Sequence, residues 1–273
     1  MTELRAFSDD GRPVTALDDG SGPVLLVVHP GGGDATSWDG VVRCLVDDFR
    51  VVRVRRRIYG PGADIALPHS MAVEAADVLA VADLLTPPVL LVGHSSGAVA
   101  ALEAALLRPS AFAGLVLYEP PIPTSRLVAG PAGARARAAL EAGDPVEATR
   151  IHMGEIVRVP AYLVDAMFAD GHLRETLCTY AAAQIAEDEA LDALGTGIDR
   201  FAALGTPTTL IEGDLSPDHL RERLADLAGV LPQARVVTLT GQGHSAHLTA
   251  PDALAATIRD AAARSGPSSD ADC

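Results

Sequence analysis

A serine flanked by glycines is the first feature of this chain that suggests catalytic chemistry. Residues 93–97 read GHSSG and fit the pattern G-x-S-x-G, with Ser95 at the centre. An apolar, strand-like run precedes this pattern and an alanine-rich, helix-like run follows it, as in a nucleophile elbow. We therefore predict that Ser95 is the nucleophile and that the backbone N–H of Ser96 faces a developing oxyanion. The alternative interpretation is a strand that ends in an ordinary turn of glycine and serine.

A second oxyanion donor is expected from an earlier, glycine-rich loop. Residues 29–33 read HPGGG and follow the apolar run 24–28. Because glycines have no side chain, their backbone amides can approach a substrate closely, and Gly31 or Gly32 would donate the second hydrogen bond. The choice between these two amides stays open, and a flexible loop without a catalytic role is the alternative interpretation.

A serine hydroxyl attacks at neutral pH only when a general base accepts its proton. The chain has eight histidines, and His244 stands in the segment VVTLTGQGHSAHLTAP, after a strand-like run and a G-x-G pattern. We predict that His244 is the base. His247 is expected to pack nearby or to face solvent. The side chain of His94, directly before the nucleophile, is expected to point elsewhere.

The elements that must position these residues alternate along the chain. Near-continuous apolar runs, typical of strands covered by helices on both faces, occur at 24–28, 49–54, 89–92, 114–118, 208–211 and 235–239. Helical patterns lie between them, at 37–46, 71–85, 97–107, 218–227 and 252–263. This alternation predicts an α/β fold with a doubly wound, mostly parallel sheet. The segments LRAF and PVTAL near the start predict an antiparallel edge hairpin.

The interval 122–205 has no convincing strand-like run and is rich in alanine, glutamate and arginine. We predict a helical cap inserted here, over the carboxyl ends of the strands, where open α/β sheets bind ligands. The core domain would comprise residues 1–121 and 206–264, and residues 265–273 would form a disordered tail. Apolar candidates for the substrate pocket, for each of which plain helix packing is an equal alternative, are Trp38, Met153, Tyr162, Met167 and Phe168.

The motifs HPGGG, GHSSG and GQGH, in this order and spacing, resemble the α/β-hydrolase superfamily over nearly the whole chain. The resemblance implies a catalytic acid after the penultimate core strand, three residues after a glycine in a G-x-x-D pattern. Ser216 stands at that position here, and Asp214 and Asp218 are out of register.

Some members of the superfamily, including a subgroup of haloalkane dehalogenases, carry the acid at an earlier strand end, after the nucleophile helix. Glu119 in the segment GLVLYEPP occupies that place. We therefore favour Glu119 as the acid that orients His244, with Asp214 as the alternative.

Two further departures from the resemblance bear on the chemistry. The nucleophile is a serine, which disfavours the aspartyl-ester chemistry of dehalogenases and epoxide hydrolases in this superfamily. Related sequences often read Asp-Arg-Arg-Gly-x-Gly where this chain reads RRRIYG, so Arg55 replaces the Asp and Ile58 replaces the Gly. We expect a solvated, structural role for the arginines at 55–57, with a positive patch for an anionic substrate as the alternative.

The resulting hypothesis is a serine hydrolase, of carboxylesterase type, that cleaves a carboxylic ester, lactone or thioester of a small molecule through an acyl-enzyme. This chemistry requires no metal and no organic cofactor. The same fold used as a cofactor-free lyase, acyltransferase or perhydrolase, or as a non-catalytic protein that binds a small molecule, is the alternative.

The composition narrows the choice of partners. A formal net charge of −15 disfavours binding to nucleic acid or to an anionic membrane, and no apolar run approaches the roughly 18 residues of a membrane span. The first twenty residues lack a secretory pattern. Three widely spaced cysteines predict neither a disulfide framework nor a zinc site. We expect a cytoplasmic monomer or homodimer whose partner is a small-molecule substrate.

Overall fold

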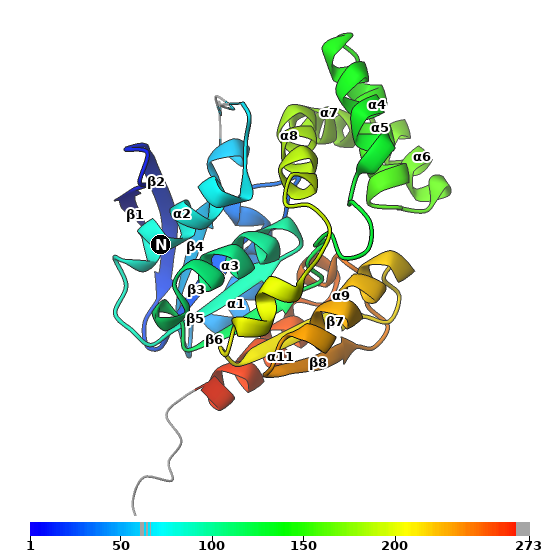
Figure 1. The fold of residues 1–273 in the computed structure, drawn as a ribbon. Helices are drawn as coiled ribbons and strands as arrows, with labels where there is room; N and C mark the ends of the chain where they lie inside the picture. The colour runs from blue at the N-terminus through cyan, green and yellow to red at the C-terminus, as the bar shows by residue number, and fades with distance from the viewer. Residues whose placement is uncertain (61–62, 64, 66, 266–273) are drawn as a thin grey trace, which may run out of the picture.

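One sheet of eight strands forms the centre of this computed structural model, which describes residues 1–60, 63, 65 and 67–265 (Figure 1). The strand order is β1-β2-β4-β3-β5-β6-β7-β8. Pairs β1–β2 and β2–β4 are antiparallel, and every later pair is parallel. The strand bounds are β1 Thr2–Phe7, β2 Pro13–Gly20, β3 Val24–Val28, β4 Arg50–Arg55, β5 Val89–His94, β6 Gly114–Tyr118, β7 Thr208–Gly213 and β8 Ala234–Leu239.

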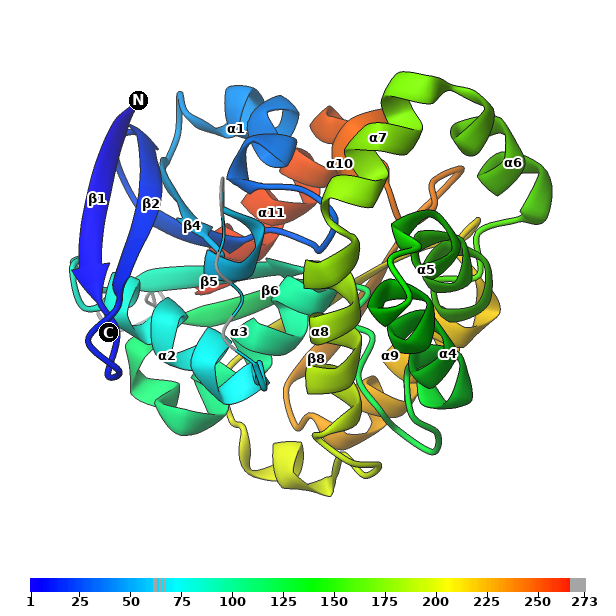
Figure 2. The ribbon, with the colours of Figure 1, turned by 90° about the horizontal axis from the view of Figure 1, so that it is seen from above.

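Helices cover both faces of the sheet, as the continuous apolar strands require (Figure 2). Side chains of α2, α3 and α9 pack on one face, and those of α1 and α11 pack on the other. In β3, Leu26 belongs to the first of these cores, whereas Leu25 and Val27 belong to the second. The bounds are α1 Asp39–Leu45, α2 Met71–Ala82, α3 Ser96–Leu107, α9 Asp218–Val230, α10 Ala246–Thr249 and α11 Pro251–Ser265.

The segment between β6 and β7 is helical and rises over the sheet on one side in both views (Figures 1 and 2). Its last residues return to the core, since Phe201 and Leu204 pack in the larger hydrophobic cluster. The bounds are α4 Gly130–Glu141, α5 Pro145–Ile151, η4 His152–Ile156, α6 Ala161–Ala169, α7 Gly171–Thr179, α8 Ala181–Asp192 and η5 Asp199–Ala203, where η4 is a π-helix and η5 a 3-10 helix.

The structure agrees with the predicted α/β class and mostly parallel sheet, and its element bounds differ in detail. The single helix predicted at 37–46 is two pieces, the 3-10 helix η1 (Ala35–Trp38) and α1. Asp34 starts the first piece early, because its side chain accepts a hydrogen bond from the N–H of Thr36. Two more short 3-10 helices are η2 (Arg57–Tyr59) and η3 (Pro109–Ala111). The N-terminal hairpin forms as β1 and β2, with β1 at the edge.

Two further predictions concern the C-terminal tail and membrane-spanning helices. Residues 266–273, nearly all of the predicted tail, lie outside the described residues. Among the helices that are described, none combines the length and apolar character needed to cross a membrane.

Candidate active site

Ser95 occupies a strained turn between β5 and α3. Its backbone has φ 54° and ψ −129°, a conformation that is costly for a residue with a side chain. A hydrogen bond from the Ser95 N–H to the carbonyl oxygen of Tyr118, over 2.8 Å, ties the turn to the end of β6. A side chain at Gly97 would collide with the end of β3, since its Cβ would lie 2.9 Å from the Val28 carbonyl carbon. This is the geometry of a nucleophile elbow.

His244 and Glu119 form a hydrogen-bonded pair. His244 Nδ1 lies 2.6 Å from Glu119 Oε2, and the second carboxylate oxygen accepts the N–H of Gly213 over 2.7 Å. Glu119 is fully buried, whereas the side chain of His244 is 22% exposed. Because Nδ1–H donates to the carboxylate, Nε2 is the ring nitrogen left to accept a proton. Glu119 also has a positive φ of 44°, so its backbone is strained at the end of β6.

The carboxylates of the alternative acid position lie elsewhere. Asp214 is exposed, and its Oδ1 accepts the N–H of Gly241 over 2.7 Å. Asp218 begins α9 on the surface, while Ser216 is buried and its hydroxyl has no hydrogen-bond partner among the described residues. Of the candidate acids, the structure therefore brings Glu119 and not Asp214 to His244.

The loop that carries His244 is tied to the sheet by two buried side chains. The Tyr118 hydroxyl donates to the carbonyl oxygen of Gly243 and accepts the N–H of Ala246 over 3.2 Å. His94 Nε2–H donates to the carbonyl oxygen of His244 over 3.0 Å, and the His94 ring stacks on Tyr118 with centroids 4.4 Å apart. These contacts hold the loop of His244 in place, and they give His94 a supporting position.

Three histidines beside the pair are held in the neutral form. Burial lowers the pKa of His94 well below its usual value, assisted by the neighbouring His247 and His244. Burial likewise lowers the pKa of His247 to about 4, with His244 adding to the effect. Burial, together with Arg158 and Arg223, lowers the pKa of His219 to about 4. The imidazole rings of these three histidines are therefore uncharged at neutral pH.

The glycine loop after β3 borders the same cavity as Ser95. Gly31, Gly32 and Ser96 all line it together with Ser95 and His244. A Cβ at Gly31 would lie 2.7 Å from the hydroxyl of buried Tyr59, so a side chain here would force that hydroxyl to shift. The loop and the start of α3 thus both border the cavity that Ser95 lines.

A buried arginine links this region to the cap. Arg56 Nη1 donates to the Ser96 hydroxyl over 3.0 Å, its Nε donates to Glu74 over 2.9 Å, and its Nη2 pairs with Glu187 from α8. Glu187 also accepts the Tyr59 hydroxyl over 2.7 Å. Arg56 is fully buried, so the solvated role expected for this arginine is wrong. Its charge is matched by two carboxylates that the cap and α2 supply, because an unpaired buried charge is costly.

The cavity between core and cap measures about 360 Å³, which suits a small molecule. Met153 and Met167 line it, as expected. Three other predicted lining residues do not. Trp38 is completely buried beneath the His94 and His247 rings, Phe168 packs inside the cap under Arg150, and Tyr162 is 72% exposed on the outer surface. Helical periodicity in the cap does not reveal which apolar side chain faces the core.

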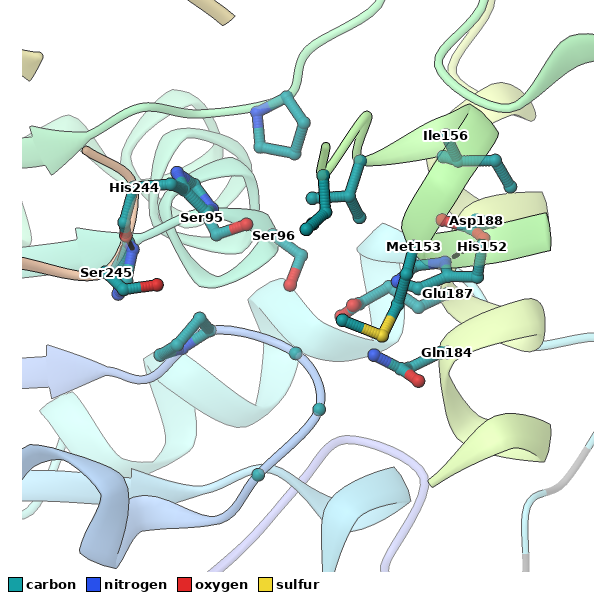
Figure 3. A pocket seen from close by; sticks show the side chains of 18 of the residues that line it. Ser95, Ser96, His152, Met153, Ile156, Gln184, Glu187, Asp188, His244 and Ser245 are labelled. Atoms are coloured by element: carbon teal, nitrogen blue, oxygen red, sulfur yellow. Dashed lines mark hydrogen bonds and ion pairs between the residues drawn. The ribbon is translucent and has the colours of Figure 1, made fainter. Parts of the chain in front are cut away.

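Sequence reasoning missed the polar wall that the cap contributes. His152 and Asp188 form a second histidine–carboxylate pair, with 2.7 Å between Nδ1 and Oδ2, and both line the cavity beside Gln184 (Figure 3). No sequence motif surrounds these residues, which come from η4 and α8. The adjacent acids at 187 and 188 in a mainly apolar helix were the available signal. No group of three or more histidines, cysteines or acids within the described residues has an arrangement that could hold a metal ion.

Comparison with known proteins gives the family. A model of the alpha/beta hydrolase family matches residues 24–257. The pimeloyl-[acyl-carrier protein] methyl ester esterase of Methylococcus capsulatus is 37% identical over 112 residues, which cover 41% of this chain and 41% of that protein. The match therefore spans about two fifths of that relative's length.

Two solved structures are similar over nearly the whole chain. An alpha/beta hydrolase from Sphaerobacter thermophilus superposes with a TM-score of 0.82 and 28% identity, covering 94% of this chain and 99% of that one. A hydrolase from Pseudomonas aeruginosa has a TM-score of 0.79 and 24% identity, covering 96% and 98%. With the elbow at Ser95 and the strand order described above, the chain belongs to the alpha/beta hydrolase family.

Proposed function

We propose that this protein hydrolyses carboxylic esters, lactones or thioesters of small molecules through an acyl-enzyme on Ser95. One observation carries the proposal: Ser95 on its strained elbow and the hydrogen-bonded pair of His244 and Glu119 open into one cavity. The esterase named among the relatives, although matched over two fifths of its length, supports the same reaction class.

The first half of the proposed reaction forms the acyl-enzyme. Ser95 Oγ attacks the substrate carbonyl while His244 Nε2 accepts its proton. Buried Glu119 stabilises the imidazolium that results and holds the ring in the tautomer with the proton on Nδ1. The oxyanion receives hydrogen bonds from the Ser96 N–H and from an amide of the loop at Gly31 and Gly32.

The second half returns the enzyme to its starting state. The imidazolium of His244 gives its proton to the leaving alcohol or thiol, and Ser95 remains as an acyl ester. The same ring then removes a proton from water, which attacks the acyl carbon; as the bond to Ser95 Oγ breaks, the imidazolium returns that proton to Ser95 Oγ and the acid is released. Each proton is taken up and returned by one histidine, so this cycle consumes only substrate and water.

The test combines covalent labelling of the protein with measurement of its ester hydrolysis. The protein is treated with a fluorophosphonate and, separately, assayed with p-nitrophenyl acetate and butyrate. We expect mass spectrometry to find the phosphonyl adduct on Ser95, and Ser95→Ala to lose labelling and at least about 10³-fold in kcat. The control is Ser110→Ala, which removes an exposed serine in η3 and should change neither readout. Labelling at another residue, or turnover that survives Ser95→Ala, would refute the proposal.

A further inference from the structure

The wall of the cavity contributed by the cap carries a polar cluster that the proposed reaction does not use. His152 begins the π-helix η4, and Asp188 and Gln184 project from α8. Figure 3 shows these three side chains at the opposite end of the view from Ser95 and His244. Most of the other cap residues that line the cavity are apolar, including Val157, Met167 and Leu177, which makes the polar cluster distinct.

Two side-chain nitrogens of the cluster have no hydrogen-bond partner among the described residues. His152 uses Nδ1 to bind Asp188, and no hydrogen bond joins its Nε2 to any atom of the described residues, although the ring lines the cavity. Gln184 is 9% exposed; its Oε1 is buried, and Figure 3 shows its amide nitrogen turned toward the cavity. Both nitrogens are therefore free to bind a ligand in the cavity.

The neighbouring charges define which ligand group fits. Glu187 and Asp188 both lie along this wall, and one guanidinium, that of Arg56, faces Glu187. Bringing a substrate carboxylate here would place it beside two carboxylates, which Coulomb repulsion disfavours. An uncharged oxygen accepts hydrogen bonds from His152 Nε2–H and from the amide nitrogen of Gln184 without that penalty.

We propose that His152, oriented by Asp188, and Gln184 form a subsite that binds an uncharged oxygen of the substrate, a ketone or a hydroxyl, away from the scissile bond. The inference rests on the proposed ester-hydrolase function and names its substrate class: oxo- or hydroxy-substituted esters, preferred to plain alkyl esters. His152 is a binding residue in this scheme, and Asp188 is a positioning residue that fixes its ring. The π-helix that starts at His152 fits this role, because such turns are frequent at functional sites.

The protonation of His152 supplies an independent signature. Burial lowers the pKa of His152, but the charge of Asp188 and the hydrogen bond to it outweigh burial, and the net shift is upward. Glu187 is the other charge that faces the ring. On the helices packed against η4, the ion pairs Arg135–Glu155, Arg137–Glu189 and Arg150–Asp165 engage most of the remaining charges, and Glu141 and Glu147 are exposed to solvent. Below its raised pKa, Nε2 carries a proton and donates to the substrate oxygen.

The substrates are p-nitrophenyl esters in matched pairs. The 4-oxopentanoate, 5-oxohexanoate and 6-oxoheptanoate are each compared with the alkyl ester of equal chain length, so that the ketone is scanned along the cavity. Mono-p-nitrophenyl adipate is the anionic member. We expect at least one ketone ester to exceed its alkyl partner about tenfold in kcat/KM at pH 6, and the adipate to show no gain.

The kcat/KM of each ketone ester, divided by that of its alkyl partner, measures the contribution of the subsite alone. Protonation of His244 affects both esters of a pair equally and cancels in the ratio. The ratio should therefore fall as pH rises through the pKa of His152, when Nε2 loses its proton. A ratio of one at every chain length and pH, or a preference for the adipate, would overturn the subsite.

Variants test whether the preference for ketone esters depends on the pair of His152 and Asp188. The double variant His152→Phe/Asp188→Leu removes both partners together, which avoids a lone buried carboxylate, and should bring the ratio to about one. Asp188→Asn should weaken the pH dependence of the ratio. The control is His172→Phe, an exposed histidine of α7 that does not line the cavity and should leave the ratio unchanged. A preference that survives the double variant would contradict the assignment.

The two proposals fail in different ways. If alkyl esters are hydrolysed and labelled at Ser95 but no ketone preference exists, the subsite is wrong and the hydrolase proposal stands. If no ester is turned over and Ser95 is not labelled, the hydrolase proposal fails, and the subsite fails with it. The pH dependence of the wild-type ratio remains decisive even if the double variant does not fold.

Discussion

His244 Nδ1 lies 2.6 Å from Glu119 Oε2, which joins the loop after β8 to the end of β6. The neighbouring strand β7 completes this arrangement, since the Gly213 N–H donates to the other oxygen of Glu119. A buried carboxylate that accepts two hydrogen bonds is held in one orientation. Ser216 has no carboxylate and Asp214 contacts Gly241, so Glu119 is the acid that lies against His244.

Replacing each of the two candidate acids by its amide gives the sharpest test of this arrangement. We expect Glu119→Gln to lower kcat about 10³- to 10⁴-fold, because the amide neither stabilises the imidazolium nor enforces the tautomer. Asp214→Asn is the matched control and should change kcat less than about twofold, since Asp214 contacts Gly241 at the surface. Steady-state kinetics with p-nitrophenyl butyrate measure both, and the reverse order would exclude Glu119 as the acid.

The pH profile reports the base. A histidine accepts the serine proton only when its ring is neutral, so activity on a plain alkyl ester should fall as pH drops from 8 toward 5. His94, His219 and His247 contribute little to this fall, because their pKa values are lowered and they stay neutral over that range. Rates of p-nitrophenyl butyrate hydrolysis in buffers of constant ionic strength check this, and a flat profile would count against His244.

Buried neutral histidines should also make stability depend on pH. The pKa is lowered to about 3 in His29 and to about 4 in His219 and His247, so the unfolded chain binds more protons below its ordinary histidine pKa. The free energy of unfolding therefore falls as pH drops from 7 toward 4, by on the order of 1 kcal/mol per histidine. His152 acts in the opposite direction, since its pKa is raised.

Guanidinium denaturation at pH 7 and pH 5 measures this effect. We expect His247→Gln to reduce the pH dependence, because it removes one group that must stay neutral when folded. His172→Gln is the control at an exposed position of α7 and should leave the pH dependence as in the wild type. Identical loss of stability in wild type and His247→Gln would show that His247 is not one of the groups responsible.

Two glycines in helices should respond oppositely to alanine. In Gly97→Ala the new methyl group would press on the carbonyls of Val28 and His29, so we expect a loss of about 1–3 kcal/mol in unfolding free energy. Gly229 in α9 has open space around its Cβ position and no positive φ, so Gly229→Ala should gain about 0.5–1 kcal/mol. Thermal unfolding of both variants measures the difference, and equal effects would refute the close approach at Gly97.

The elbow at Ser95, the α/β alternation and the loop of His244 carry local signals: apolar runs of strand length, helical patterns and glycines at turns. Local signals of this kind depend on neighbours in the chain, and they were sufficient to predict the fold class and these two residues. The choice of Glu119 over Asp214 needed a resemblance as well, because two carboxylates near strand ends look equivalent in a sequence.

The tertiary structure alone decided which cap residues face the core. Arg56, Glu187, His152 and Asp188 are widely separated in sequence, and they meet because α8 crosses over the carboxyl ends of the strands. Trp38 and Phe168 are buried on other surfaces of their helices, which no periodicity in the sequence distinguishes. Contacts between elements depend on how helices pack and cross, a property of the whole fold, so the polar wall opposite Ser95 became visible only in three dimensions.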